Sequence, residues 1–175
     1  MQFDTDTKIE LNKERLSKDI QEIRSIQNSY PLYFAYLAFI GLNLIEVVKY
    51  LKGYQSNKIH DNILLVLSIL TILITAISIW KFIQLLYPKE IHYDKLPKEV
   101  YNDYYSELEE HYGSDYDELN EETKKGYLEY LELSVEQNFK LYAEKRQLLY
   151  QIVVIALISL IPYISLIIVN FIYNG

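Results

Sequence analysis

Three long stretches without a charged side chain dominate this sequence, and they limit the folds that it can adopt. The first covers residues 25–45, the second covers residues 62–80, and the third begins after Arg146 and lasts to Gly175. Each is close to or above the length of about 20 apolar residues that a helix needs to cross a bilayer. A soluble bundle of buried helices is the alternative, but helices that are apolar on every face are rare in a small soluble domain.

The sequence therefore predicts an all-α integral membrane protein with three transmembrane helices and a helical cytoplasmic region. The expected segments are an N-terminal amphipathic cytoplasmic helix at 1–30, a first span at 31–52, a short outer loop at 53–61, a second span at 62–87, an acidic helical cytoplasmic region at 88–147 and a third span at 148–173. Lysine and arginine collect on the cytoplasmic side of membrane proteins. Their distribution here predicts a multi-pass protein of the inner (plasma) membrane, with the N-terminus in the cytoplasm and the C-terminus outside.

The N-terminal segment has the pattern of an amphipathic helix over residues 5–28. Its apolar residues recur on one face, and Thr7 and Glu10 have the spacing of a capping box. The apolar residues on this face are Ile9, Leu16, Ile20 and Ile23. The apolar face could lie in the membrane interface or pack on other cytoplasmic helices. Because the opposite face mixes acids with bases, we favour packing.

The cytoplasmic region 88–147 predicts two helices. Leu96 and Pro97 are typical of a helix start, and Gly113 should end that helix. Asn120 followed by two glutamates predicts the start of a second helix. That second helix should continue without a break and become the third span.

Apolar residues along the first half of this long helix recur at spacings of three and four. The stripe consists of Leu128, Leu131, Val135, Asn138 and Tyr142. This periodicity resembles a coiled coil and predicts an oligomer contact, in which a buried Asn138 would fix the register and the number of chains. The alternative is that Asn138 simply faces water.

Polar residues within the spans are the main candidates for function. Ser68, Thr71, Thr75 and Ser78 lie on one stripe of the second span. They either help helices to pack closely or line a pore that several copies form together. Asn43 and Glu46 are polar groups in the first span, where Glu46 either has a function or forms an interfacial pair near Lys49. Pro162 should kink the third span, either as a gate or as a static bend.

Residues for catalysis are not evident. The chain has no cysteine, and His60, His92 and His111 lie far apart. No catalytic or phosphate-binding motif is present. We therefore expect no enzyme activity, no metal and no cofactor.

The order of two spans, a helical cytoplasmic segment and a further span resembles small membrane effectors of bacterial anti-phage systems, namely SLATT-type proteins and the effector of Hailong-type systems. The stretch from Tyr130 to Arg146 leading into the third span carries this resemblance. The resemblance implies a homo-oligomer that is held closed until a nucleotide or oligonucleotide signal changes, and that then permeabilises the membrane. Bases that could bind such a ligand are Lys140, Lys145, Arg146 and those of the N-terminal helix.

Two functions remain open at this point. One is an oligomeric pore or channel-type effector, because three spans with so few polar groups cannot enclose a channel within one chain. The other is a membrane anchor or scaffold that recruits a soluble partner protein through its cytoplasmic helices.

Overall fold

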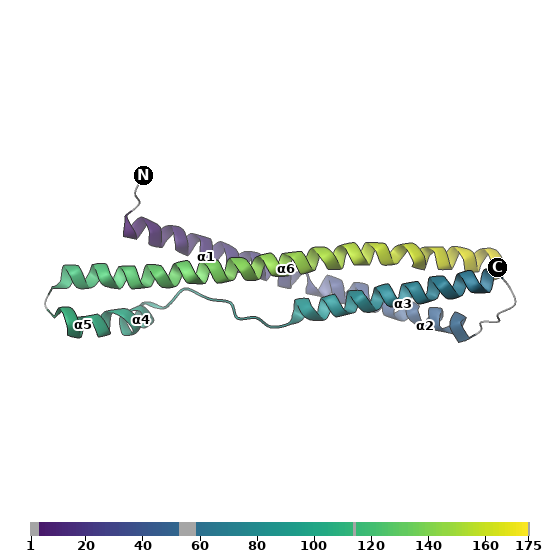
Figure 1. Ribbon diagram of the computed structural model, residues 1–175, viewed down its shortest axis with the longest axis horizontal. Coiled ribbons are helices and arrows are strands. Elements are labelled where there is room, and N and C mark those ends of the chain that lie inside the picture. Colours follow the sequence, from purple (N-terminus) through teal and green to yellow (C-terminus); the bar gives the residue numbers. More distant parts are fainter. Residues whose placement is uncertain (1–3, 53–58, 114, 175) are drawn as a thin grey trace. The chain divides into compact units, whose positions relative to one another are not determined.

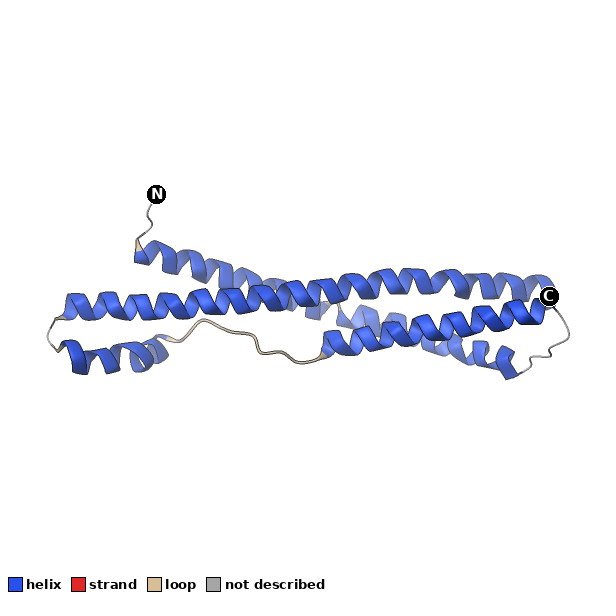
Figure 2. Cartoon of the chain, viewed as in Figure 1, coloured by secondary structure: helices blue, strands red, loops and turns tan. Residues whose placement is uncertain are grey.

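The computed structural model describes residues 4–52, 59–113 and 115–174, and the side chains at positions 43, 46, 47, 50–52, 59, 60, 170, 173 and 174 lie outside this description. The elements are α1 (Thr5–Asn28), α2 (Tyr30–Lys52), α3 (Ile59–Leu86), α4 (Pro97–Val100), the π-helical turn η1 (Tyr101–Tyr105), α5 (Ser106–Tyr112) and α6 (Tyr116–Asn174). Figure 2 shows helices and loops and no strand among the described residues. The predicted all-α class is therefore confirmed.

The chain divides into two compact units. We call residues 1–25 with 89–144 the polar unit, and residues 26–88 with 145–175 the apolar unit. Helices α1 and α6 contribute residues to both units, and α6 continues as one helix through the boundary (Figure 1).

Two helices are long and apolar enough to cross a membrane. They are Asp61–Leu86 of α3 and Tyr116–Val169 of α6, with mean hydropathies of 2.7 and 2.9 in their most apolar windows. Large aliphatic side chains on these helices are exposed, for example Leu73 and Ile161. The third expected span corresponds to α2 and stays a prediction, because several side chains in its second half lie outside the described residues.

The helix boundaries confirm part of the sequence analysis and correct two starts. Helix α1 has the predicted bounds, but the side chain of Asp4 accepts the Thr7 N–H at 2.7 Å, so the cap is Asp4 rather than Thr7. Helix α6 begins at Tyr116 rather than near Asn120. Its start is earlier because the Asp115 carboxylate accepts the N–H of Glu118, which satisfies a donor that the first helical turn leaves open.

The helix predicted from Pro97 is present but is not uniform. The Glu99 side chain accepts the Leu96 N–H at 2.8 Å and fixes the start of α4. A π-helical turn, η1, then separates α4 from α5. Gly113 ends α5 with a φ of 61°, a backbone conformation that favours glycine.

The core of the polar unit joins α1 to the first half of α6. Its fully buried cluster contains Leu16, Tyr127, Leu131 and Val135, with Ile9, Ile20, Val100, Tyr104 and Tyr130 packed around it. The apolar face of α1 therefore packs on other helices, as its mixed opposite face predicted.

The core of the apolar unit joins α2, α3 and the second half of α6. Leu64 and Leu166 form its buried cluster near one end. Near the other end, Phe82 is 3% exposed and packs against the rings of Tyr30, Tyr33 and Phe34.

Candidate functional site

The hydroxyl stripe of α3 faces the interior of the apolar unit. Ser68, Thr71, Thr75 and Ser78 are each at most 1% exposed. Residues on the other faces, such as Ile69, Leu73 and Ile77, are 45% to 55% exposed. The stripe forms because residues at these spacings share one face of a helix, and that face is enclosed by neighbouring helices of the same chain.

Two contacts fix how α3 and α6 run beside each other. Lys145 donates to the carbonyl of Leu85 at 3.0 Å, and Leu64 packs with Leu166 near the other end. The two helices are therefore antiparallel, with Thr71 level with Ser159. By the same register Ser68 lies level with Pro162, and Ser78 lies level with Gln151 and Ile152.

A second helix brings polar groups to the same place. The Tyr36 hydroxyl of α2 lies 2.7 Å from Ser159 Oγ and donates to the Ala156 carbonyl at 3.0 Å. Thr71, Thr75, Ser159 and Tyr163 line a small cavity together with Ile40 and Leu160, with a volume of about 10 Å³. Such a volume is at the lower limit for one water molecule. We call the α3 stripe with Tyr36, Gln151, Ser159 and Tyr163 the hydroxyl seam.

The hydroxyls of the α3 stripe differ in how they are satisfied. Thr71 donates to the Leu67 carbonyl and Thr75 to the Thr71 carbonyl, both at 2.8 Å. In contrast, Ser68 Oγ, Ser78 Oγ and Gln151 Oε1 are buried without a hydrogen-bond partner among the described residues. A buried polar atom without a partner costs about 1–3 kcal/mol, so three of them in one unit, two on α3 and one on α6, need an explanation.

The other predicted membrane residues have different outcomes. The side chains of Asn43 and Glu46 lie outside the described residues. Pro162 is buried within α6, which is helical on both sides of it. Sequence reasoning did not identify Tyr36, Gln151 or Ser159. For Gln151 and Ser159, the signal was the rarity of polar side chains in the third uncharged run.

The three bases proposed as ligand contacts are not equivalent. Lys145 is 5% exposed and donates to the Leu85 carbonyl near the end of α3, which also accepts from the Tyr30 hydroxyl at 3.1 Å. Lys140 pairs with Glu136 at 2.6 Å and is exposed, as is Arg146. A cation near the end of a helix is stabilised by the helix dipole, so Lys145 already has a structural role here.

The predicted oligomer stripe of α6 is used within one chain. Leu131, Val135 and Asn138 are buried, and Leu128 and Tyr142 are half-buried. The Asn138 side chain accepts the His92 N–H at 3.0 Å and donates to the His92 carbonyl at 2.7 Å. The alternative that Asn138 faces water is therefore wrong, and its role in setting an oligomer number stays a prediction.

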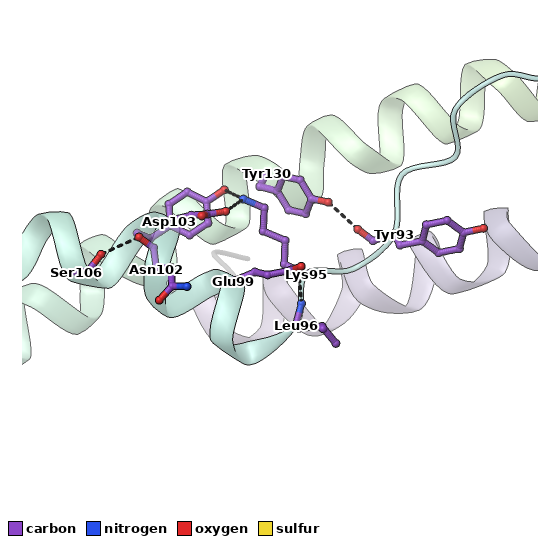
Figure 3. Close-up of polar contacts among 9 residues, drawn as sticks. Tyr93, Lys95, Leu96, Glu99, Asn102, Asp103, Ser106 and Tyr130 are labelled. Atoms are coloured by element: carbon purple, nitrogen blue, oxygen red, sulfur yellow. Dashed lines mark hydrogen bonds and ion pairs between the residues drawn. The ribbon is translucent and has the colours of Figure 1, made fainter.

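One lysine and three tyrosines hold the chain around residue 95. Lys95 pairs with Asp103 at 2.6 Å and lies 4.5 Å from the ring centroids of both Tyr104 and Tyr130, an arrangement that attracts a cation to the rings. Figure 3 shows Lys95 reaching Asp103, and the Tyr130 hydroxyl donating to the Tyr93 carbonyl. Burial lowers the pKa of Lys95, but its bonds to Asp103 and Tyr104 raise it by more, so the cation is retained.

The polar unit also has an open groove beside α1. Its walls carry Lys13, Ser17, Gln21 and Arg24 from α1, with Tyr93 and Asp94 opposite, and its volume is about 560 Å³. Asp94 is engaged by the Tyr127 hydroxyl and lies 3.9 Å from Lys13. Burial, followed by the bond to Asp94, raises the pKa of Tyr127 and keeps its hydroxyl protonated as a donor.

Comparisons with protein-family models, with curated proteins and with solved structures returned no match. The function is therefore inferred from the hydroxyl seam and the polar unit themselves.

Proposed function

We propose that this protein is a membrane effector of the pore or channel type, which permeabilises the bacterial inner membrane when it is triggered. In this proposal several copies assemble, α2 is the third transmembrane helix, the N-terminus and the polar unit lie in the cytoplasm, and the C-terminus lies outside. Defence against phage is the setting that the architectural resemblance implies.

The observation that supports this proposal most is the hydroxyl seam. Ser68 and Ser78 are each at most 1% exposed, and their Oγ atoms have no hydrogen-bond partner among the described residues. If the stripe served packing alone, each serine could bond to its own helix, as Thr71 and Thr75 do at 2.8 Å. Polar atoms left open along one line are suited to water or ions that enter when the helices move apart.

In its present arrangement the seam is closed. The cavity at its centre has a volume of about 10 Å³, which leaves no room for a hydrated ion. Opening therefore requires α3 to turn or to separate from α6, so that the stripe faces a path shared between copies.

Ion flux from liposomes containing the purified protein tests the proposal. Replacing Thr71 and Thr75 together with valine removes two hydroxyls and keeps the side-chain volume. We expect this double variant to reduce flux about tenfold or more, because the path loses polar groups for the ion. As a control, Ser165→Ala removes a hydroxyl that bonds to Ile161 outside the seam and should leave flux unchanged. Absence of flux from every form of the protein would reject the proposal.

A second function, that of a membrane anchor recruiting a soluble partner, is favoured by the groove beside α1. Its residues Lys13, Ser17, Gln21 and Arg24 occupy one face of the helix and are open to solvent. Binding of a defined partner that is lost on replacing Arg24 and Gln21 with alanine, in a protein without any ion flux, would support the anchor over the pore.

A further inference from the structure

The chain between α3 and α4 has no regular structure but is held closely along α6. We call residues 89–96 the strap. At its centre, the buried amide of Asn138 forms two hydrogen bonds with the backbone of His92, at 3.0 and 2.7 Å. An amide that accepts from the N–H and donates to the C=O of one residue replaces the bonds that a neighbouring strand would make.

Further contacts hold the strap on both sides of His92. The Tyr130 hydroxyl donates to the Tyr93 carbonyl at 2.6 Å, and the Tyr127 hydroxyl donates to the Asp94 carboxylate. At the other end, Lys89 pairs with Glu144. All of these partners lie on α6, so one helix holds the strap at four successive points.

These contacts are releasable because they are polar. The buried apolar cluster of the polar unit, as far as its residues are described, contains residues of α1, α6, α4 and η1 but none of the strap. If the strap left α6, water could satisfy its peptide groups and the side chains that bind it. The cluster of Leu16, Leu131 and Val135 would stay intact.

The strap is also joined directly to the helix that carries the hydroxyl stripe. Only Tyr87 and Pro88 separate it from the end of α3 at Leu86. Three peptide units span at most about 10–11 Å, so the end of α3 stays close to the point at which Lys89 is held. Moving this end of α3 by more than that distance from the point at which Lys89 is held therefore requires the strap to be freed.

We propose that the strap is a releasable clasp, and that freeing it from α6 is the regulated step that lets α3 move and opens the hydroxyl seam. This inference rests on the proposed pore function. Asn138 is its central residue, because it forms two of the bonds and is fully buried.

Cross-linking tests whether holding the strap on α6 lowers ion flux, and reduction tests whether releasing it restores the flux. The natural chain contains no cysteine that would react as well. Lys89→Cys with Glu144→Cys places one thiol on the strap and one on α6, where a short bis-methanethiosulfonate reagent can bridge them. Glu129→Cys with Leu133→Cys is the matched control, because both positions are exposed and one turn apart, so the bridge then lies within α6 alone. The bridge at 89 and 144 should lower ion flux at least about tenfold, and reduction should restore it, whereas the control bridge should have no effect.

Asn138→Ala tests the released state, with Gln137→Ala on the exposed neighbouring position as its control. Loss of two hydrogen bonds should raise resting flux about tenfold, and adding the bridge at 89 and 144 should suppress this increase. Equal flux with and without the bridge, in liposomes that do conduct ions, would overturn the clasp and leave the pore intact. Absence of flux from every variant would overturn the proposed function itself.

Discussion

Gly126 offers a test of how the helix from Pro97 to Tyr112 is held against α6. Glycine inside a helix costs about 1 kcal/mol relative to alanine, so Gly126→Ala would ordinarily be stabilising. Here, however, an added Cβ would lie 3.0 Å from Cδ1 of Tyr104, 3.5 Å from Cε1 and 3.7 Å from Cγ. The ring cannot retreat easily, because Lys95 donates to its hydroxyl at 3.1 Å and covers its face.

The two effects oppose each other, and their magnitudes decide the sign. Overpacking of a held side chain costs about 1–3 kcal/mol, which exceeds the gain in helix propensity. We expect a net loss of about 1 kcal/mol in the natural chain. In a Tyr104→Ala background the obstruction is gone, and the same Gly126→Ala change should instead stabilise by about 1 kcal/mol.

Amide hydrogen exchange of the full-length protein in detergent measures this locally. Peptides from residues 97–112 should exchange about fivefold faster in Gly126→Ala, as a loss of about 1 kcal/mol implies. In the Tyr104→Ala background, peptides around residue 126 should exchange more slowly after the same change. Slower exchange in the natural background, or the same sign in both backgrounds, would show that the ring does not press on Gly126.

Two further predictions concern buried charged groups. Lys145→Met keeps much of the stem but removes the donor to the Leu85 carbonyl, so amides near the end of α3 should exchange about tenfold faster; unchanged exchange would mean that Lys145 does not stabilise this end of α3. Asp19 is 9% exposed, and burial raises its pKa above 3.8. Near neutral pH the protein bears the cost of burying the ionised carboxylate, so Asp19→Asn should raise the thermal unfolding temperature there. That gain should fade as the pH falls through the raised pKa, where Asp19 takes up a proton, and a gain that grows at low pH would contradict this account.

Helix positions followed from the sequence where local signals were strong. The bounds of α1, the start at Pro97 and the end at Gly113 were all predicted, because periodicity, proline and glycine act locally. The start of α6 was wrong by several residues, since the Asp115 cap competes with the equally plausible signal at Asn120.

The partners of the candidate residues could not be predicted in the same way. The hydroxyl stripe was visible in the sequence, but that it faces Tyr36 and Ser159 depends on the register between helices far apart in the chain. Asn138 was expected at a contact between chains, yet its amide binds the backbone of His92. Backbone atoms are present at every residue and leave no sequence signal of such a bond.

The central claim is that the hydroxyl seam admits water when the protein conducts. It is tested most directly by the reactivity of single cysteines in this cysteine-free chain, with Ser78→Cys in the seam and Ile77→Cys on the exposed neighbouring face. The cysteine thiolate attacks the sulfur of a thiosulfonate reagent, and this thiolate forms in water and not in lipid. In liposomes that leak ions, we predict that a membrane-impermeant reagent modifies position 78 about tenfold or more faster than position 77. Equally slow modification at both positions would contradict a water path along the seam.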